Sequence, residues 1–145
     1  TVMPGVTGQA TVIVPTGTTT TDIAEGTNLY FTSARARDAV RPSVNAVSNS
    51  TYTLSMLDDG NVVYASNATI VVPNVSTVNF TTGTEIVVQT ANTGVTLDVL
   101  NAQTSIYNTG NTQSGTWIIP ARTRAILQKL ENEVWQLTGQ NIVSF

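Results

Sequence analysis

Two pairs of carboxylates are the residues of this sequence whose spacing could support catalysis. Asp58 and Asp59 are adjacent, and Glu131 and Glu133 are separated by one residue. Two carboxyl groups at a set separation are what a glycoside hydrolase needs. Both pairs fall where the pattern predicts hairpin turns, in which such side chains bond to nearby backbone N–H groups. We therefore interpret both pairs as turn residues and assign no catalytic residue.

Other catalytic and metal chemistry is limited by composition. The 145 residues include no His and no Cys, which excludes Ser-His and Cys-His dyads, thiolate nucleophiles and metal sites built from these ligands. The segment 58–61 faintly resembles a calcium loop, but it lacks the alternating acidic spacing and the terminal Glu of an EF-hand. No phosphate-binding or dinucleotide-binding glycine pattern is present. We expect a protein that is not an enzyme and holds no metal and no cofactor.

The charge balance argues against a nucleic-acid partner. Charged residues make up 10% of the chain, six basic and nine acidic, for a net charge of −3. Arg35, Arg37 and Arg41 are half of the basic residues, but a phosphate-binding face normally leaves a domain basic. We expect these arginines to form ion pairs or to lie in solvent. No apolar run approaches the roughly 18 residues that span a bilayer, so we expect a soluble chain with no membrane insertion.

Residues 51–145 have the pattern of an all-β domain. Short β-branched runs alternate with turn residues every 8 to 12 positions, which predicts a β-sandwich or a jelly-roll-like fold. Hairpins are predicted across 58–61 and across 131–133. Residues 121–131 could also form a helix, but the tight turn that follows favours a strand. The predicted strands are 52–56, 61–65, 68–72, 84–89, 95–99, 105–107, 116–119, 123–130 and 134–138.

Residues 1–50 contain too little apolar mass to fold alone. They are rich in Thr and Gly, with short apolar islands such as 12–14. One short helix is predicted near 33–40, capped by Thr32 or Ser33 and ending before Pro42. Two helical turns are marginal in isolation. We therefore predict an extended segment for attachment and oligomerisation, covered by the same segment of neighbouring copies.

Two stretches of the sequence resemble bacteriophage fibre proteins. Residues 25–32, EGTNLYFT, followed by Ala34-Arg35-Ala36, resemble a module that recurs in phage tail fibres and related virion fibres. Residues 52–54, 59–63, 67–73, 80–86 and 134–139, the last with Trp135, resemble a β-domain common near the C-termini of phage fibre and appendage proteins. The two resemblances cover residues 21–40 and about 51–139.

The resemblance implies a homotrimeric fibre piece, made in the host cytoplasm and located in the virion with other virion proteins. On this hypothesis the aromatic cluster Leu29, Tyr30 and Phe31 packs around the trimer axis. Arg35 and Arg37 would form ion pairs with acidic residues of the same region, namely Asp22, Glu25 or Asp38.

Contact with a host-surface glycan or receptor has a separate set of candidate residues. Trp117 stands beside two Ile residues, and an exposed indole could stack on a sugar ring. Trp135 lies in an alternating strand and is expected in the core. The loop 108–115 contains Asn108, Asn111 and Gln113, whose amides could bond to a ligand, and such loops on a rigid sandwich commonly bind partners.

Three classes of function follow in order of preference. The first is a structural virion protein, a trimeric tail fibre or fibre-like appendage. The second is a capsid-decorating protein or a module that binds a receptor or carbohydrate. The third is a piece of a polysaccharide-degrading tailspike.

Overall fold

The computed structural model of the chain describes Gly17, Thr19 and residues 32–145. It divides into two compact units, Thr1–Val40 and Arg41–Phe145. The second, the β unit, begins earlier than the predicted boundary at residue 51, because strand β1 (Val44–Ala46) belongs to one of its sheets. The predicted trimerisation residues Leu29, Tyr30 and Phe31 lie outside the described residues.

The described part of the first unit contains helix α1 (Ser33–Val40). The Thr32 hydroxyl accepts a hydrogen bond from Arg35 N–H at 3.2 Å, which satisfies a backbone donor of the first turn. Pro42 follows the helix by two residues and disfavours its continuation. The short helix and its Thr32 cap are therefore confirmed. None of the eight helical residues is buried.

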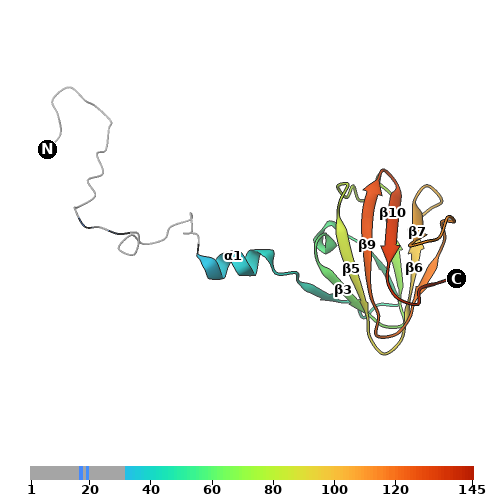
Figure 1. Ribbon diagram of the computed structural model, residues 1–145, viewed down its shortest axis with the longest axis horizontal. Coiled ribbons are helices and arrows are strands. Elements are labelled where there is room, and N and C mark those ends of the chain that lie inside the picture. Colours follow the sequence, from blue (N-terminus) through green and yellow to red (C-terminus); the bar gives the residue numbers. More distant parts are fainter. Residues whose placement is uncertain (1–16, 18, 20–31) are drawn as a thin grey trace, which may run out of the picture. The chain divides into compact units, whose positions relative to one another are not determined.

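The β unit consists of two packed sheets, and the predicted all-β, sandwich-like fold is confirmed (Figure 1). One sheet has six strands in the order β1-β3-β5-β9-β10-β7, and the other has five in the order β11-β8-β6-β4-β2. The strands after β1 are β2 (Thr51–Thr53), β3 (Val62–Ala65), β4 (Thr69–Val72), β5 (Glu85–Thr90), β6 (Val95–Val99), β7 (Ser105–Asn108), β8 (Trp117–Ile119), β9 (Arg124–Glu131), β10 (Val134–Thr138) and β11 (Val143–Ser144).

The first six strands form three coils that pass alternately through the two sheets. Strands β1, β3 and β5 are parallel neighbours in the first sheet, and β2, β4 and β6 are parallel neighbours in the second. Val44 pairs with Val62 and Thr51 with Thr69, so the first coil is 18 residues long in both sheets. These parallel pairings distinguish the sandwich from a jelly roll, whose two sheets are antiparallel.

The predicted hairpin across 58–61 is wrong. Strands β2 and β3 belong to different sheets, and the short 3₁₀ helix η2 (Met56–Asp58) carries the chain from one to the other. The hairpin across 131–133 is confirmed, because β9 and β10 pair antiparallel, with a bulge between Val134 and Trp135. The strand interpretation of 121–131 is confirmed with it.

The core lies between the sheets and takes alternate residues from the strands. In β9 the buried positions are Ala125, Leu127 and Lys129, every second residue. The Phe80 and Trp135 rings meet edge to face, with centroids 5.4 Å apart. Lys129 reaches through this layer and donates from Nζ to the Phe80 carbonyl oxygen at 2.6 Å. The other buried apolar residues are Leu54, Val63, Ala65, Ala68, Ile70, Val72, Ile86, Val88, Val95, Leu97, Ile106, Trp117, Ile119 and Leu137.

Gly94 allows the chain to enter β6 against the backbone that leaves β8. A Cβ at this position would lie 2.5 Å from the Ile119 carbonyl oxygen and 3.2 Å from Pro120 Cα.

We expect Gly94→Ala to lower the free energy of unfolding by about 1–3 kcal/mol through this overlap. Chemical denaturation at fixed protein concentration measures the change. Gly115→Ala is the control, because no atom lies within 4 Å of its Cβ position; equal losses in both variants would contradict the packing argument.

Candidate functional site

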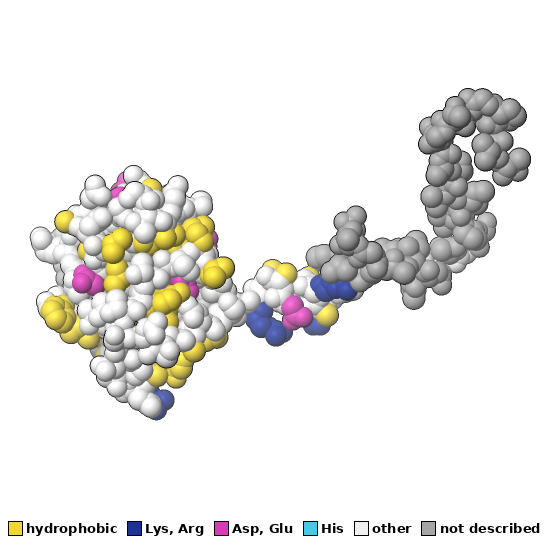
Figure 2. Space-filling view, turned by 180° about the vertical axis from the view of Figure 1, so that it is seen from behind, with side chains coloured by type: hydrophobic (Ala, Val, Ile, Leu, Met, Phe, Trp, Pro, Cys, Tyr) yellow, Lys and Arg dark blue, Asp and Glu magenta, His cyan; other side chains and the backbone are white. Residues whose placement is uncertain are grey.

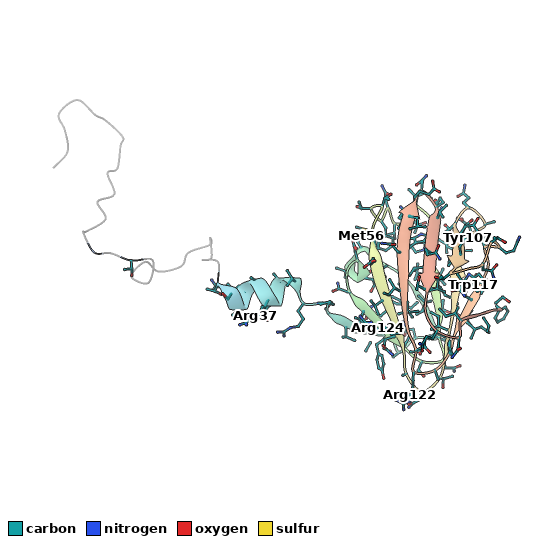
Figure 3. All side chains as sticks on the ribbon, in the orientation of Figure 1. Arg37, Met56, Tyr107, Trp117, Arg122 and Arg124 are labelled. Carbon is teal, nitrogen blue, oxygen red and sulfur yellow. The ribbon has the colours of Figure 1, made fainter. Side chains whose placement is uncertain are left out.

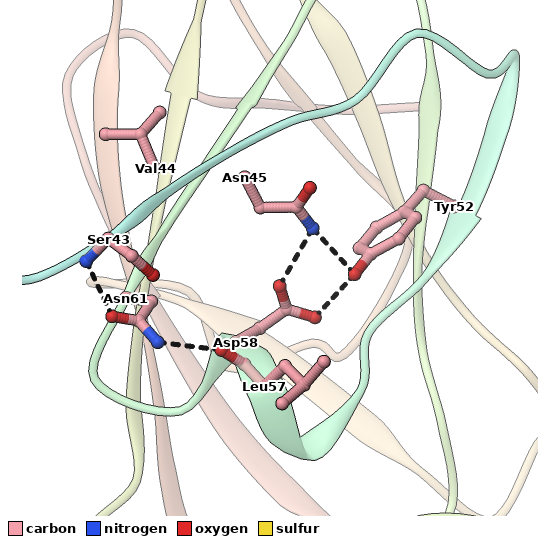
Figure 4. A pocket seen from close by; sticks show the side chains of 7 residues that line it. All are labelled: Ser43, Val44, Asn45, Tyr52, Leu57, Asp58 and Asn61. Carbon is pink, nitrogen blue, oxygen red and sulfur yellow. Dashed lines mark hydrogen bonds between the residues drawn. The ribbon is translucent and has the colours of Figure 1, made fainter.

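A cavity of about 560 Å³ opens where the first coil leaves the two sheets uncovered (Figure 4). Strand β1 supplies one wall, β2 a second, and η2 with the start of β3 supplies the rest. Five of the seven lining residues carry polar side chains, and the other two are aliphatic. The lining residues are Ser43, Val44, Asn45, Tyr52, Leu57, Asp58 and Asn61.

Asp58 lines this cavity, and its side chain is buried. Its carboxylate accepts hydrogen bonds from the Tyr52 hydroxyl at 2.9 Å and from Asn45 Nδ2 at 3.2 Å. The Ser55 backbone N–H at 2.8 Å and the Ser55 hydroxyl at 3.3 Å donate to the same oxygen as Tyr52. The Ser55 bond arises locally, because Asp58 lies one turn after the residue that begins η2.

Tyr52 and Asn45 come from different sheets and meet above this carboxylate. Asn45 Nδ2 also donates to the Tyr52 oxygen at 2.8 Å, so the three side chains form a closed ring of hydrogen bonds (Figure 4). Burial raises the pKa of the Tyr52 hydroxyl, and its hydrogen bond to Asp58 raises that pKa further. Both causes disfavour a phenolate beside an ionised carboxylate.

This arrangement assigns Asp58 a structural role that the sequence did not predict. Four hydrogen-bond donors hold its carboxylate in place, and through Asn45 and Tyr52 the carboxylate links β1 to β2. Asp58 is therefore the buried residue of a short 3₁₀ helix and does not lie in a hairpin turn, whereas Asp59 is exposed at the end of that helix. In the part of the chain that the structure describes, no three or more His, Cys, Asp or Glu residues gather as a group that could hold a metal ion.

The second acidic pair lies at the β9–β10 turn, as predicted, but Glu133 also makes long-range contacts. Its carboxylate accepts from the Val75 backbone N–H at 2.8 Å and from the Thr104 hydroxyl at 2.7 Å. It thereby ties two loops, distant in sequence, to the turn between β9 and β10. Sequence reasoning identified the turn and missed these partners, because neither lies near Glu133 in the chain.

Trp117 does not present an exposed face for sugar stacking, and this expectation is corrected. The side chain is 3% exposed, and its Nε1–H donates to the Ile106 carbonyl oxygen at 2.9 Å (Figure 3). The alternation in β8 turns Trp117 and Ile119 inward, so the partly exposed residue is Ile118. The indole therefore joins β8 of one sheet to β7 of the other. Trp135 is buried as expected.

The loop candidates divide between a structural residue and exposed ones. Asn108 is half-buried at the end of β7, and its Nδ2 donates to the Ile142 carbonyl oxygen at 3.4 Å. Asn111 and Gln113 are exposed, and Asn111 Oδ1 accepts from the Gln113 backbone N–H at 3.0 Å. Beside them lies a cavity of about 240 Å³, lined by Val99, Ala102, Thr104, Ser105, Ile106, Ser114, Gly115 and Thr116.

The arginines lie at the surface, whereas the lysine, Lys129, is buried. Arg35 and Arg37 are exposed on α1, where Figure 2 shows dark blue side chains together, while the visible face of the β unit is mostly uncharged. Arg122 and Arg124 are also exposed. The acidic residues Asp22 and Glu25, predicted as partners of the helix arginines, lie outside the described residues.

Comparisons of the chain with protein-family models, curated proteins and solved structures found no match. Among the described residues, no helix is long and apolar enough to cross a membrane.

Removal of the Tyr52 hydroxyl tests the hydrogen-bonded ring around Asp58. We expect Tyr52→Phe to lower the free energy of unfolding by about 1–3 kcal/mol, because the buried Asp58 carboxylate and the Asn45 amide each lose a hydrogen-bond partner. Urea titration measures this loss. Tyr64→Phe, at an exposed position of β3, is the matched control and should change stability by less than about 0.5 kcal/mol.

The raised pKa of Tyr52 should make the stability of the folded chain depend on pH in the alkaline range. Above the ordinary value of 10.0, the folded chain keeps the phenolic proton that the unfolded chain releases. This contribution to stability is fully present below about pH 10 and is lost as the pH rises through the folded pKa. Urea titrations from pH 9 upward should show a steeper loss in the parent chain than in Tyr52→Phe; parallel curves would refute the assignment.

Proposed function

We propose that this chain is a non-enzymatic structural component of a bacteriophage virion, a homotrimeric tail fibre or fibre-like appendage. The observation that carries the proposal is α1, an eight-residue helix with no buried side chain. It occupies the end of the region that resembles the module of phage fibres. The β unit is then the knob or spacer that follows this module.

Helix energetics support association between copies. Nucleation makes an eight-residue helix marginal in water, so it needs tertiary or quaternary packing to be populated. Ala36 and Val40 lie one turn apart on the same face of α1, and Val40 is 80% exposed. Burial of a Val side chain contributes about 1.5–3 kcal/mol. Three copies that share this face would each gain that contribution.

One carboxylate of each candidate acidic pair supports a non-enzymatic role. The Asp58 carboxylate accepts hydrogen bonds from Ser55, Tyr52 and Asn45. The Glu133 carboxylate accepts hydrogen bonds from Val75 and Thr104. In both cases the hydrogen bonds hold the fold and involve backbone groups. This favours a structural protein over a polysaccharide-degrading tailspike. Incubation with host surface polysaccharide at high protein concentration should release no reducing sugar.

The oligomeric state tests the proposal directly. Light scattering after size exclusion should give three times the 15.3 kDa chain mass for the full chain. Val40→Lys should weaken assembly roughly tenfold or more, because an ammonium group would enter a desolvated contact, while Lys suits the end of a helix. Leu130→Lys, at an exposed position of β9, is the control and should assemble normally. A chain that elutes and scatters as a monomer would overturn the proposal.

A second candidate function, contact with a host-surface glycan or receptor, is favoured by the exposed amides of Asn111 and Gln113 beside the smaller cavity. The cavity presents hydroxyl-bearing residues and no charged side chain, which suits a neutral saccharide.

Labelled protein should bind host cells if this second candidate function holds. Binding to fibreless particles would support the appendage, and binding to the capsid would support a decorating protein. The double variant Asn111→Ala and Gln113→Ala should reduce binding to host cells and leave binding to particles unchanged.

A further inference from the structure

Both sheets of the β unit end on the same side, at the first coil, with strand edges that pair with no other described residue. The Val47 N–H donates to the Tyr64 carbonyl oxygen at 2.8 Å, and the Ser43 carbonyl accepts from Val62 N–H at 2.9 Å. Residues 43, 45 and 47 therefore face β3. Because backbone groups alternate in direction along a strand, the N–H and C=O groups of Val44 and Ala46 point away from the sheet.

The edge of β2 has the same arrangement in the second sheet. The Leu54 N–H donates to the Val71 carbonyl oxygen at 3.0 Å, and the Ser50 carbonyl accepts from Thr69 N–H at 2.8 Å. The backbone groups of Thr51 and Thr53 therefore point outward. Each sheet thus presents two N–H donors and two C=O acceptors at its first-coil edge.

These edges lack the protection that sheet edges commonly carry. Neither Val44–Ala46 nor Thr51–Thr53 contains a charged residue or a proline, and no bulge interrupts their pairing. The opposite edge of the six-stranded sheet is partly covered, because Tyr107 of β7 bridges to Ser114 and Gly115 N–H donates to Ile106 at 3.1 Å. Stacked coils need a cap at each end, and the first coil has none among the described residues.

Apolar side chains surround the open edges. Val44 is 64% exposed, Leu57 is 83% exposed and Met56 is 52% exposed; Figure 3 shows Met56 at the margin of the β unit. Val44 and Leu57 line the cavity whose floor is the Asp58 network. The polar atoms of that network already have hydrogen-bond partners. The groups at this end that a partner could still contact are the outward backbone groups and the exposed apolar side chains.

We infer that the first-coil edge, defined as β1, β2, Met56 and Leu57, is an interface between copies of this chain, in which outward backbone groups pair with an edge strand of the next copy. The inference rests on the proposed trimer. Three residues separate Val40 of α1 from Val44, a length of chain that spans at most about 14 Å. If α1 associates, the first strand of each copy begins near the same axis.

Charge also favours a second copy as the occupant. The chain carries a net charge of −3, so two copies repel each other overall unless they meet at uncharged surfaces. The strands at this edge are uncharged and the Asp58 carboxylate is buried in hydrogen bonds, so the edges approach with little repulsion. An uncharged edge with both donors and acceptors is complementary to another such edge.

Hydrogen exchange of individual backbone amides in the full chain tests the interface without mutation. The amides of Val44, Ala46, Thr51 and Thr53 should exchange on the order of 100-fold more slowly than unstructured amides in the assembled protein. The amides of Asn45 and Tyr52 face the neighbouring strands and are the internal control, protected in either case. Unprotected exchange at the four outward amides in a sample that scatters as an oligomer would overturn the interface and leave the proposed trimer intact.

Two surface variants give a second measurement. Val44→Lys and Leu57→Lys place a charge at exposed positions of the edge and should weaken assembly roughly tenfold or more, with unchanged far-UV circular dichroism. Leu130→Lys is the control. Assembly unaffected by both edge variants would refute this interface alone, whereas a monomeric parent chain would refute the trimer and the interface together.

Discussion

Each backbone N–H and C=O group in a strand needs a partner, and in the first half of the β unit that partner lies on the strand one coil away. Val44 pairs with Val62, which in turn pairs with Val87. In the other sheet Thr51 pairs with Thr69, which in turn pairs with Thr96. This pairing keeps both sheets in step, so the inward residues of one coil cover those of the next and build a continuous core. Among the described residues, the first coil has no earlier neighbour in either sheet, which leaves the β1 and β2 edges open on one side.

The few charged side chains at buried or half-buried positions serve this architecture. Asp58 holds the start of η2 and joins Asn45 of one sheet to Tyr52 of the other. Glu133 binds the backbone of Val75, and Lys129 binds the carbonyl of Phe80. Each charge is thus used to fix a connection between coils or loops, since regular strand pairing does not reach those segments.

The elements that were predicted correctly are those whose determining interactions are local. The helix depends on the Thr32 cap and on Pro42, and the β9–β10 hairpin depends on alternation and a short turn, all within a few residues. The hairpin across 58–61 was wrong because its signal, a turn between two β-branched runs, is the same whether the strands pair or enter different sheets. Trp117 remained a candidate for sugar stacking because a run of three apolar residues does not indicate which face of the strand is buried.

The sequence alone determined that this chain folds mostly as short strands, lacks His and Cys chemistry, and carries one short helix before the β unit. These properties follow from composition and from spacing over a few residues. Only the tertiary structure decided that the strands stack as parallel coils, that Asp58 closes the end of the first coil, and that the unpaired edges of both sheets fall on one side. Parallel pairing joins residues separated by a whole coil, and coils of unequal length leave no repeat in the sequence to reveal it.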